Sequence, residues 1–154
     1  MSNIRVLLVD DHVLMRATLR SLLEKNADIE IIAEAGNGRD AVRLIMEQQP
    51  DVVLMDIAMP LMNGLDAARM VKGYAHVRIV ILSMHADEEY LEQALEAGVV
   101  GYVLKDAIKV DILPAVWAAA HGERYFSAEV SQEVISEYLR KIDSKPKEVA
   151  TPKE

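Results

Sequence analysis

The sequence predicts an α/β protein of (βα)5 architecture, in which helices cover both faces of a doubly wound, five-stranded parallel sheet. Three observations lead to this fold class. Short apolar runs rich in Val, Ile and Leu alternate along the chain with longer segments of helical period. The runs contain continuous apolar stretches, as in strands that are buried on both faces. Strict alternation of strands and helices favours parallel strands joined by right-handed crossovers.

Each predicted strand is a short run of β-branched or other apolar residues that ends near a polar residue. The first run reads IRVLLV and precedes two aspartates, and the third reads DVVLM and precedes Asp56. The second run, IEIIAEA, holds two acids, and near its carboxyl end it offers only Glu34, inside the run. Runs of this length and composition are typical of strands. The predicted strands cover 4–9, 29–35, 51–55, 78–83 and 101–105.

The predicted helices lie between and after these strands. The fourth begins after Asp87, an expected N-cap that two acids follow, and ends at Gly98. The fifth falls within 108–121, where Pro114 predicts a kink or a late helix start because proline lacks an amide hydrogen. The first three are recognised by apolar residues near the i, i+4, i+7 spacing of one helix face. These residues are Met15, Leu19, Leu22 and Leu23; Ala41, Leu44 and Ile45; and Leu65, Ala68 and Val71.

The C-terminal part of the chain predicts one more helix and then a tail. We expect this sixth helix over 128–141, with Ser127 as its N-cap and with one apolar face. The following residues, 143–154, are charged, contain prolines and offer little to bury, which is typical of a flexible linker. The chain is thus divided into a domain of residues 1–122, a helical extension of residues 123–142, and the tail.

Length and composition exclude several classes of protein. The 154 residues suffice for one domain, and the absence of cysteine excludes disulfides, thiolate catalysis and cysteine-ligated metals. A formal net charge of −8 argues against binding of nucleic acid by this segment, because phosphate contacts need clustered Lys and Arg. No apolar stretch approaches the roughly 18 to 20 residues of a membrane span, and the chain opens without a leader. We therefore expect a cytoplasmic protein that does not enter a membrane.

Five polar residues fall at the carboxyl ends of the predicted strands. Asp10 and Asp11 follow the first strand, and Asp56 follows the third. Ser83 ends the fourth strand and Lys105 ends the fifth. Parallel strands bring their carboxyl ends to one edge of the sheet, where ligands bind in such folds. We therefore expect three carboxylates, a hydroxyl and an ammonium to converge there.

These residue types point to phosphoryl transfer. Neighbouring carboxylates repel one another unless a cation intervenes, and an oxygen-rich site suits Mg²⁺, which commonly bridges carboxylates to phosphate. Aspartate is a nucleophile toward phosphorus. The ammonium of Lys105 and the hydroxyl of Ser83 are able to stabilise charge on the transferring group. His12 and His85 lack a zinc-like spacing, so we do not expect them to bind a metal.

Three stretches resemble a known family: LLVDDH (7–12), VVLMDIAMPLMNGLDA (52–67) and VILSMHADEEYLEQALEAGVVGYVLKD (80–106). They are similar to the receiver domain of two-component response regulators, especially of the NarL/LuxR (FixJ) type, over about residues 3–122. The resemblance implies a flavodoxin-like sheet with strand order 2-1-3-4-5. It also implies a phosphoryl donor, which is a sensor histidine kinase or a phosphotransfer protein. The final VATPKE resembles the start of the family's helix-turn-helix domain, so we expect transcription regulation and DNA binding to depend on residues beyond this chain.

The resemblance assigns roles to the polar residues by position. Asp56 is similar to the phosphoacceptor, Asp11 to the direct Mg²⁺ ligand, and Asp10 to the acid that acts through water. The backbone carbonyl of Ala58 matches the third protein ligand of the metal. Lys105 matches the lysine that contacts the phosphoryl group.

A second set of residues resembles the family's switch. Ser83 matches the switch hydroxyl, and Tyr102 matches the aromatic residue that turns inward when phosphorylation draws the hydroxyl toward the phosphate. This change would bias the face formed by the fourth helix, the fifth strand and the fifth helix. Ala58 and His85 flank the path of the hydrolytic water, so we predict that they set the lifetime of the phosphoryl group. The implied protein is a switch and not an enzyme, apart from its own phosphorylation and slow dephosphorylation.

Three alternatives stay open. The first is a degenerate receiver that acts without phosphate as a docking or dimerisation module. The second, a phosphohydrolase of the haloacid dehalogenase type, needs a second aspartate where Ala58 stands. The third, a flavodoxin-like cofactor binder, would place the FMN phosphate beside Asp10 and Asp11, which repel it.

The predicted fifth helix carries a second apolar stripe besides its core face. The stripe consists of Val110, Pro114 and Trp117, at the i, i+4, i+7 spacing of one helix face. Exposed aromatic residues with apolar neighbours often mark an interface. We expect this stripe to be covered by the sixth helix or by a second copy of the chain, as in a homodimer.

Overall fold

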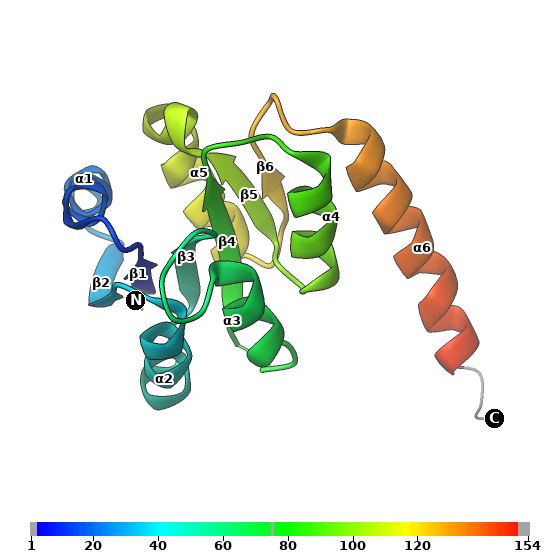
Figure 1. Ribbon diagram of the computed structural model, residues 1–154, viewed down its shortest axis with the longest axis horizontal. Coiled ribbons are helices and arrows are strands. Elements are labelled where there is room, and N and C mark those ends of the chain that lie inside the picture. The colour runs from blue at the N-terminus through cyan, green and yellow to red at the C-terminus, as the bar shows by residue number, and fades with distance from the viewer. Residues whose placement is uncertain (1–2, 75, 151–154) are drawn as a thin grey trace.

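Six parallel strands form the sheet of this protein. The computed structural model describes residues 3–74 and 76–150, and there the strands pair in the order β2-β1-β3-β4-β5-β6 (Figure 1). The α/β class and the strand order 2-1-3-4-5 are confirmed, and the sheet has one strand more than the five predicted. The strands are β1 (Ile4–Val9), β2 (Ile29–Ala35), β3 (Val52–Asp56), β4 (Arg78–Ser83), β5 (Gly101–Leu104) and β6 (Tyr125–Phe126).

Two apolar cores lie on opposite faces of the sheet, because side chains alternate along each strand. In β1, Leu7 and Val9 join the core that includes residues of α2, α3 and α4, whereas Val6 and Leu8 join the core that includes residues of α1 and α5. Burial on both faces explains the continuous apolar sequence of the strands. The helices are α1 (Val13–Leu23), α2 (Gly38–Gln48), α3 (Gly64–Met70), α4 (Glu88–Glu96), α5 (Ile108–Ala120) and α6 (Gln132–Ala150).

The ends of α4 and the position of Pro114 test the predicted helix signals. Asp87 is the N-cap of α4, since its carboxylate accepts the amide hydrogen of Glu89 at 2.8 Å, and Gly98 follows the helix with a φ of 90°. The late start predicted near Pro114 is wrong, because α5 begins six residues earlier at Ile108. Proline leaves the carbonyl of Val110 without its helical donor, but Val110 is 74 % exposed, so water can replace that donor.

The C-terminal extension differs most from its prediction. Ser127 is not a helix N-cap; it is fully buried beside the unpredicted strand β6, and α6 begins later, at Gln132. A two-residue strand is too short to give a periodic signal. The structure also continues α6 to Ala150, past the helix end predicted at Lys141 and into the predicted flexible tail, where Lys and Glu favour helix. Residues 151–154 of that tail lie outside the described residues.

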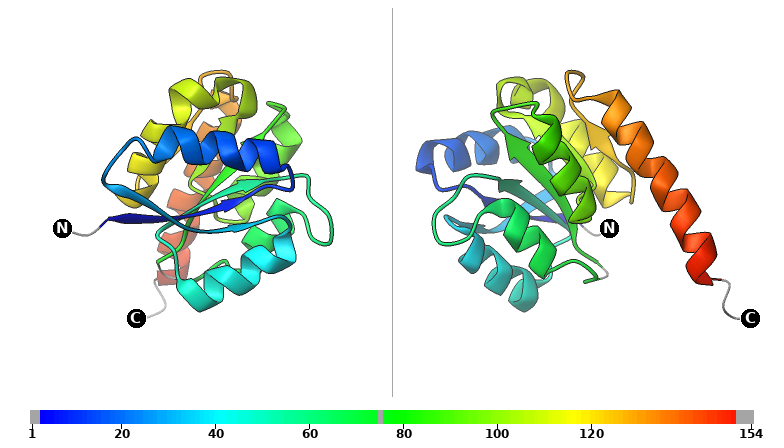
Figure 2. Two further views of the ribbon diagram at one scale, coloured as in Figure 1. Left: turned by 90° about the vertical axis from the view of Figure 1, so that its left-hand side faces the viewer. Right: turned by 45° about the vertical axis from the view of Figure 1, so that its right-hand side comes forward.

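Helix α6 lies alongside α4 and not over the apolar stripe of α5 (Figure 2). Val130 and Ile135 are buried in the same core cluster as Leu91 and Leu95 of α4. The exposure of Val110 shows that the predicted cover by the sixth helix is wrong. The apolar face of α6 explains this choice, because it completes the core on the α4 side of the sheet. In the described part of the chain, no helix is both long and apolar enough to cross a membrane.

Candidate functional site

The carboxyl ends of β1, β3 and β5 bring the predicted acids and the lysine together. The Nζ atom of Lys105 lies 2.9 Å from Oδ2 of Asp10 and 3.2 Å from Oδ1 of Asp56. Asp10 is fully buried and Asp56 is 5 % exposed, while Asp11 lies at the surface beside them. We call Asp10, Asp11, Asp56 and Lys105 the acidic edge. Residues that are 95 positions apart in the sequence thus form one contact.

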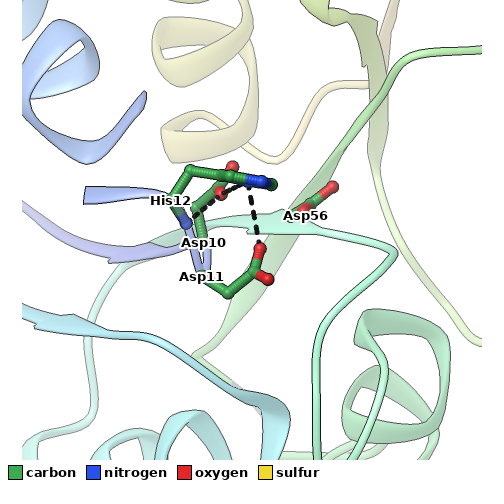
Figure 3. Close-up of side chains that lie close together, drawn as sticks. All are labelled: Asp10, Asp11, His12 and Asp56. Atoms are coloured by element: carbon green, nitrogen blue, oxygen red, sulfur yellow. Dashed lines mark hydrogen bonds and ion pairs between the residues drawn. The ribbon is translucent and has the colours of Figure 1, made fainter. Parts of the chain in front are cut away.

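The carboxylates of the acidic edge are arranged as a cation site (Figure 3). One ligand atom from each of Asp10, Asp11, His12 and Asp56 lies within 4.8 Å of the others. The Nδ1 atom of His12 is 3.1 Å from a carboxylate oxygen of both Asp10 and Asp11, a contact that the spacing of the histidines did not predict. Three carboxylates, of which those of Asp10 and Asp56 are buried, fit Mg²⁺, which prefers oxygen ligands.

The charge of the acidic edge is not balanced by its lysine. Burial raises the pKa of the Asp56 carboxyl, and the negative charge of Asp10 raises it further, against the opposing effect of Lys105. Burial lowers the pKa of Lys105, but its hydrogen bond to Asp10 and the charge of Asp56 outweigh burial, so the net shift is upward. Lys105 therefore stays an ammonium. One positive charge facing three carboxylates leaves the edge suited to a further cation.

Arg16 of α1 supports the backbone of Asp10, a role that the sequence did not predict. The Nη1 atom of Arg16 donates to the backbone carbonyl of Asp10 at 2.5 Å, and its Nε atom donates to Glu34 at 2.9 Å. Burial raises the pKa of Glu34, but hydrogen bonds from Arg20 and Arg16 lower it below its usual value. The sequence feature that could have indicated this support is the i, i+4 spacing of Arg16 and Arg20, together with Glu34 inside the second strand.

A glycine allows the loop after β3 to lie against the acceptor strand. The amide of Gly64 donates to the carbonyl of Ile57 at 2.8 Å, and a Cβ atom at Gly64 would collide with the carbonyl oxygen of Asp56. Asn63 caps α3 by accepting the amide hydrogen of Asp66 at 2.8 Å. The Asn-Gly pair is thus a helix start packed on the acidic edge. Ala58, in the same loop, is exposed.

The predicted switch residues converge on the backbone of His85. Ser83 donates its hydroxyl to the His85 carbonyl at 3.0 Å and accepts the His85 amide hydrogen at 3.1 Å. The hydroxyl of Tyr102 donates to the same carbonyl at 3.0 Å, and Tyr102 is fully buried. Burial raises the pKa of Tyr102, which keeps the hydroxyl neutral and able to donate. The side chain of Tyr102 therefore points inward in this structure, and its movement on phosphorylation stays a prediction.

The apolar stripe of α5 is only partly covered. Val110 and Pro114 are exposed, whereas Trp117 is half-buried and stacks on His121 with 5.8 Å between the ring centroids. Because α6 packs on α4, a second copy of the chain is the remaining predicted cover for the stripe. Its role as an interface stays a prediction.

Comparison with known proteins identifies the family. The family model of the response regulator receiver domain matches residues 6–117. This chain belongs to the response regulator receiver domain family. The transcriptional regulatory protein DegU of Brevibacillus brevis is 34 % identical over 148 residues, which are 96 % of this chain. The chain spans 63 % of the length of that relative.

Solved receiver structures agree with the sequence comparison. A LuxR-family response regulator from Aurantimonas sp. SI85-9A1 superimposes with a TM-score of 0.81 at 34 % identity, covering 90 % of this chain and 99 % of that one. The signal receiver domain of NarL from Mycobacterium tuberculosis gives a TM-score of 0.76 at 34 % identity, covering 80 % of this chain and all of that one. The sequence resemblance to receivers of the NarL/LuxR type is thereby confirmed.

Proposed function

We propose that this receiver domain accepts a phosphoryl group on Asp56 from a phosphohistidine and acts as a two-state switch. The observation that carries this proposal is the contact of one buried ammonium, Lys105, with both Asp10 and Asp56. This contact supports the proposal because it brings the proposed nucleophile and the proposed cation ligands to one positive charge at one edge of the sheet. A purely structural ion pair would not require the third carboxylate, Asp11, beside it.

The donor set of the acidic edge is suited to hold Mg²⁺. Asp11, Asp56 and the backbone carbonyl of Ala58 are the proposed direct ligands, with Asp10 acting through water. When bound there, Mg²⁺ supplies positive charge that offsets the carboxylates and the incoming phosphoryl oxygens.

The proposed transfer is an in-line displacement at phosphorus. Oδ1 of Asp56 is engaged by Lys105, which leaves Oδ2 as the nucleophile. Oδ2 forms the new O–P bond while the N–P bond to the donor histidine breaks. The electron pair of the N–P bond stays on the imidazole nitrogen, which takes up a proton. Lys105 then lies close enough to stabilise charge on the phosphoryl oxygens. Slow hydrolysis of the acyl phosphate would reset the domain.

The switch is proposed to run through Ser83 and Tyr102. Oxygens of a phosphoryl group on Asp56 would compete with the His85 carbonyl for the Ser83 hydroxyl. Release of that carbonyl changes the acceptor that Tyr102 shares with Ser83. A phosphoryl group would thus favour one arrangement of the face formed by α4, β5 and α5.

Ala58 and His85 are proposed to set the lifetime of the phosphoryl group, because both are exposed and lie two residues after Asp56 and Ser83, respectively. A polar side chain at either position could orient or exclude the attacking water. We expect the double variant Ala58→Asn, His85→Ala to change the dephosphorylation rate of the purified phosphoprotein. An unchanged dephosphorylation rate would contradict this part of the proposal.

The proposed partners are a sensor histidine kinase or a phosphotransfer protein, and a second copy of this chain at the α5 stripe. The name of DegU describes a transcriptional regulatory protein. We propose that the whole protein regulates transcription and that this segment does not bind the DNA itself, in keeping with its net charge of −8. The second candidate is a degenerate receiver that signals by docking alone, which the exposed stripe favours.

Intact mass after incubation with Mg²⁺ and acetyl phosphate tests the proposal. We expect one phosphoryl adduct on the native chain, none without Mg²⁺, and none on Asp56→Asn. Asp66→Asn, an exposed aspartate on α3, is the matched control and should form the adduct. Absence of an adduct on the native chain with any donor would leave the docking module as the function. An adduct on Asp56→Asn would place the phosphorylation site elsewhere.

A further inference from the structure

Two buried polar residues lie outside the acidic edge and bond to each other. Among the residues that the structure describes, the buried polar residues Asp10, Asp56 and Ser83 belong to the site already described. Asp111 of α5, 7 % exposed, and Ser127 after β6, fully buried, lie outside it. Burial of a carboxylate is costly unless its hydrogen bonds are made, so the pair calls for an explanation.

Ser127 joins three elements through its hydrogen bonds. Its hydroxyl donates to Oδ2 of Asp111 at 2.7 Å and accepts the amide hydrogen of Leu104 at 3.0 Å. Its own amide donates to the carbonyl of Tyr102 at 3.0 Å. Tyr125 completes the group by donating its hydroxyl to Oδ1 of Asp111 at 2.6 Å. We call Asp111, Tyr125 and Ser127 the clamp.

The clamp holds the part of β5 that carries the switch. Strand β6 has only two residues. Just beyond its end, the side-chain oxygen of Ser127 accepts the amide hydrogen of Leu104 in β5. Leu104 directly precedes Lys105 of the acidic edge. Ser127 therefore bonds to two backbone positions, Tyr102 and Leu104, of the segment that leads to Lys105.

The clamp is also tied to the position of α6. The amide of Val130 donates to the Ser127 carbonyl at 3.0 Å, so the turn after Ser127 is fixed to it. Val130 and Ile135 are buried in the cluster that contains Tyr102 and Leu91 of α4. A shift of the end of β5 would thus be passed by a short chain of packed and bonded groups to the contact between α4 and α6. Figure 1 shows the path from β5 through β6 into α6.

We propose that Ser127, fixed by Asp111, is a positioning residue that couples the acidic edge to the docking of α6 on α4. It holds Lys105 and Tyr102 in place through the backbone of β5, and it passes a change there to α6. This inference rests on the proposed phosphorylation of Asp56 and deepens it, because it names α6 as the element that phosphorylation displaces. The two states are α6 docked on α4 and α6 with a weakened contact.

Hydrogen exchange of the full chain, with and without acetyl phosphate and Mg²⁺, tests the coupling. In Ser127→Ala the Leu104 amide should exchange about tenfold faster, the equivalent of roughly 1.4 kcal/mol for one buried hydrogen bond. In the native chain, phosphorylation should speed exchange of the α6 amides in 132–142, and in Ser127→Ala this response should be lost. Ser136→Ala, an exposed serine of α6, is the matched control and should respond as the native chain does.

The outcomes separate a coupling role from a merely structural one. A structural clamp predicts lower stability of Ser127→Ala but the same α6 response to phosphorylation, and that result would overturn the inference. So would a native chain that forms the adduct without a change in α6 exchange. Intact mass on the same samples shows whether the adduct forms, so failure of the proposed function is seen separately. If circular dichroism shows that Ser127→Ala does not fold, Tyr125→Phe removes one support of Asp111 and should weaken the response.

Discussion

The acidic edge and the clamp both bury carboxylates, but they compensate the charge in different ways. At the acidic edge, two buried aspartates face one ammonium at 2.9 and 3.2 Å, and a third carboxylate lies beside them. In the clamp, Asp111 accepts hydrogen bonds from two neutral hydroxyls at 2.6 and 2.7 Å. At the acidic edge, the negative charge of three carboxylates exceeds the positive charge of Lys105. The second satisfies a single carboxylate with donors that carry no charge.

This difference shows when a buried acid marks a chemical site. The pKa of Asp56 is raised because burial and the charge of Asp10 exceed the help from Lys105, which leaves a demand for another cation. In the clamp, the hydrogen bond to Asp111 raises the pKa of Tyr125 to about 12, so the tyrosine stays a neutral donor. Burial alone therefore does not indicate function. An excess of like charge among the buried groups does.

The largest expected effect is that of Asp111→Ala. This change leaves the buried hydroxyl of Ser127 and the half-buried hydroxyl of Tyr125 without their acceptor inside the protein, and an unpaired buried group costs about 1 to 3 kcal/mol. We expect the free energy of unfolding, measured in urea, to fall by roughly 3 kcal/mol. Asp106→Ala, an exposed acid just before α5, is the control and should change it little. Equal effects of the two variants would mean that the clamp does not stabilise the fold.

Gly64→Ala should disturb the acidic edge without changing any charge. The added Cβ would collide with the backbone of Asp56, so the loop after β3 must shift, at a cost of about 2 kcal/mol. We expect lower stability in urea and slower formation of the phosphoryl adduct. Gly36→Ala is the control, because a Cβ there meets its nearest neighbour at an ordinary 3.5 Å. Normal phosphorylation of Gly64→Ala would show that the loop position is not needed for the site.

Tyr125→Phe should have a smaller effect, of about 1 kcal/mol at neutral pH, since it removes one hydrogen bond and leaves Asp111 a second donor. The folded-state pKa of Tyr125, about 12, lies above the ordinary value of 10.0. The contribution of Tyr125 to stability is therefore complete below pH 10 and is lost as the pH rises from 10 through the folded-state pKa of about 12. Unfolding measured from pH 8 to 12 should show this loss in the native chain and less of it in the variant. Identical pH profiles would contradict the role of this hydrogen bond.

Asp56→Asn should have the smallest effect and the opposite sign. The raised pKa of Asp56 means that its ionised form destabilises the fold, so native stability should increase as the pH falls through that raised pKa toward the ordinary value of 3.8. Without Mg²⁺ at pH 7, we expect the variant to be more stable than the native chain by up to about 1 kcal/mol. Added Mg²⁺ should reduce this advantage. A less stable variant would mean that the charges of the acidic edge are already balanced. Asp28→Asn, at an exposed position, is the control for the lost negative charge.

The sequence by itself determined the central sheet and the members of the acidic edge. Nearly continuous apolar runs indicate burial on both faces, and their alternation with helices predicts a parallel sheet, while the strand order 2-1-3-4-5 came from the resemblance to receiver domains. Asp10, Asp56 and Lys105 each follow a strand end, so their meeting follows from the parallel arrangement alone. The N-cap at Asp87 was equally local, because a cap depends on three or four consecutive residues.

Only the tertiary structure decided the clamp, the support of Asp10 by Arg16, and the docking of α6. Ser127 contacts Leu104 across 23 positions and Asp111 across 16, and no periodicity relates such residues. As a serine before a helical pattern, Ser127 had the local features of an N-cap, but a buried carboxylate and a free strand amide offered it stronger partners. The inward position of Tyr102 likewise depends on the His85 carbonyl in another loop. These features arise from hydrogen bonds between distant segments, which form only after the core has brought those segments together.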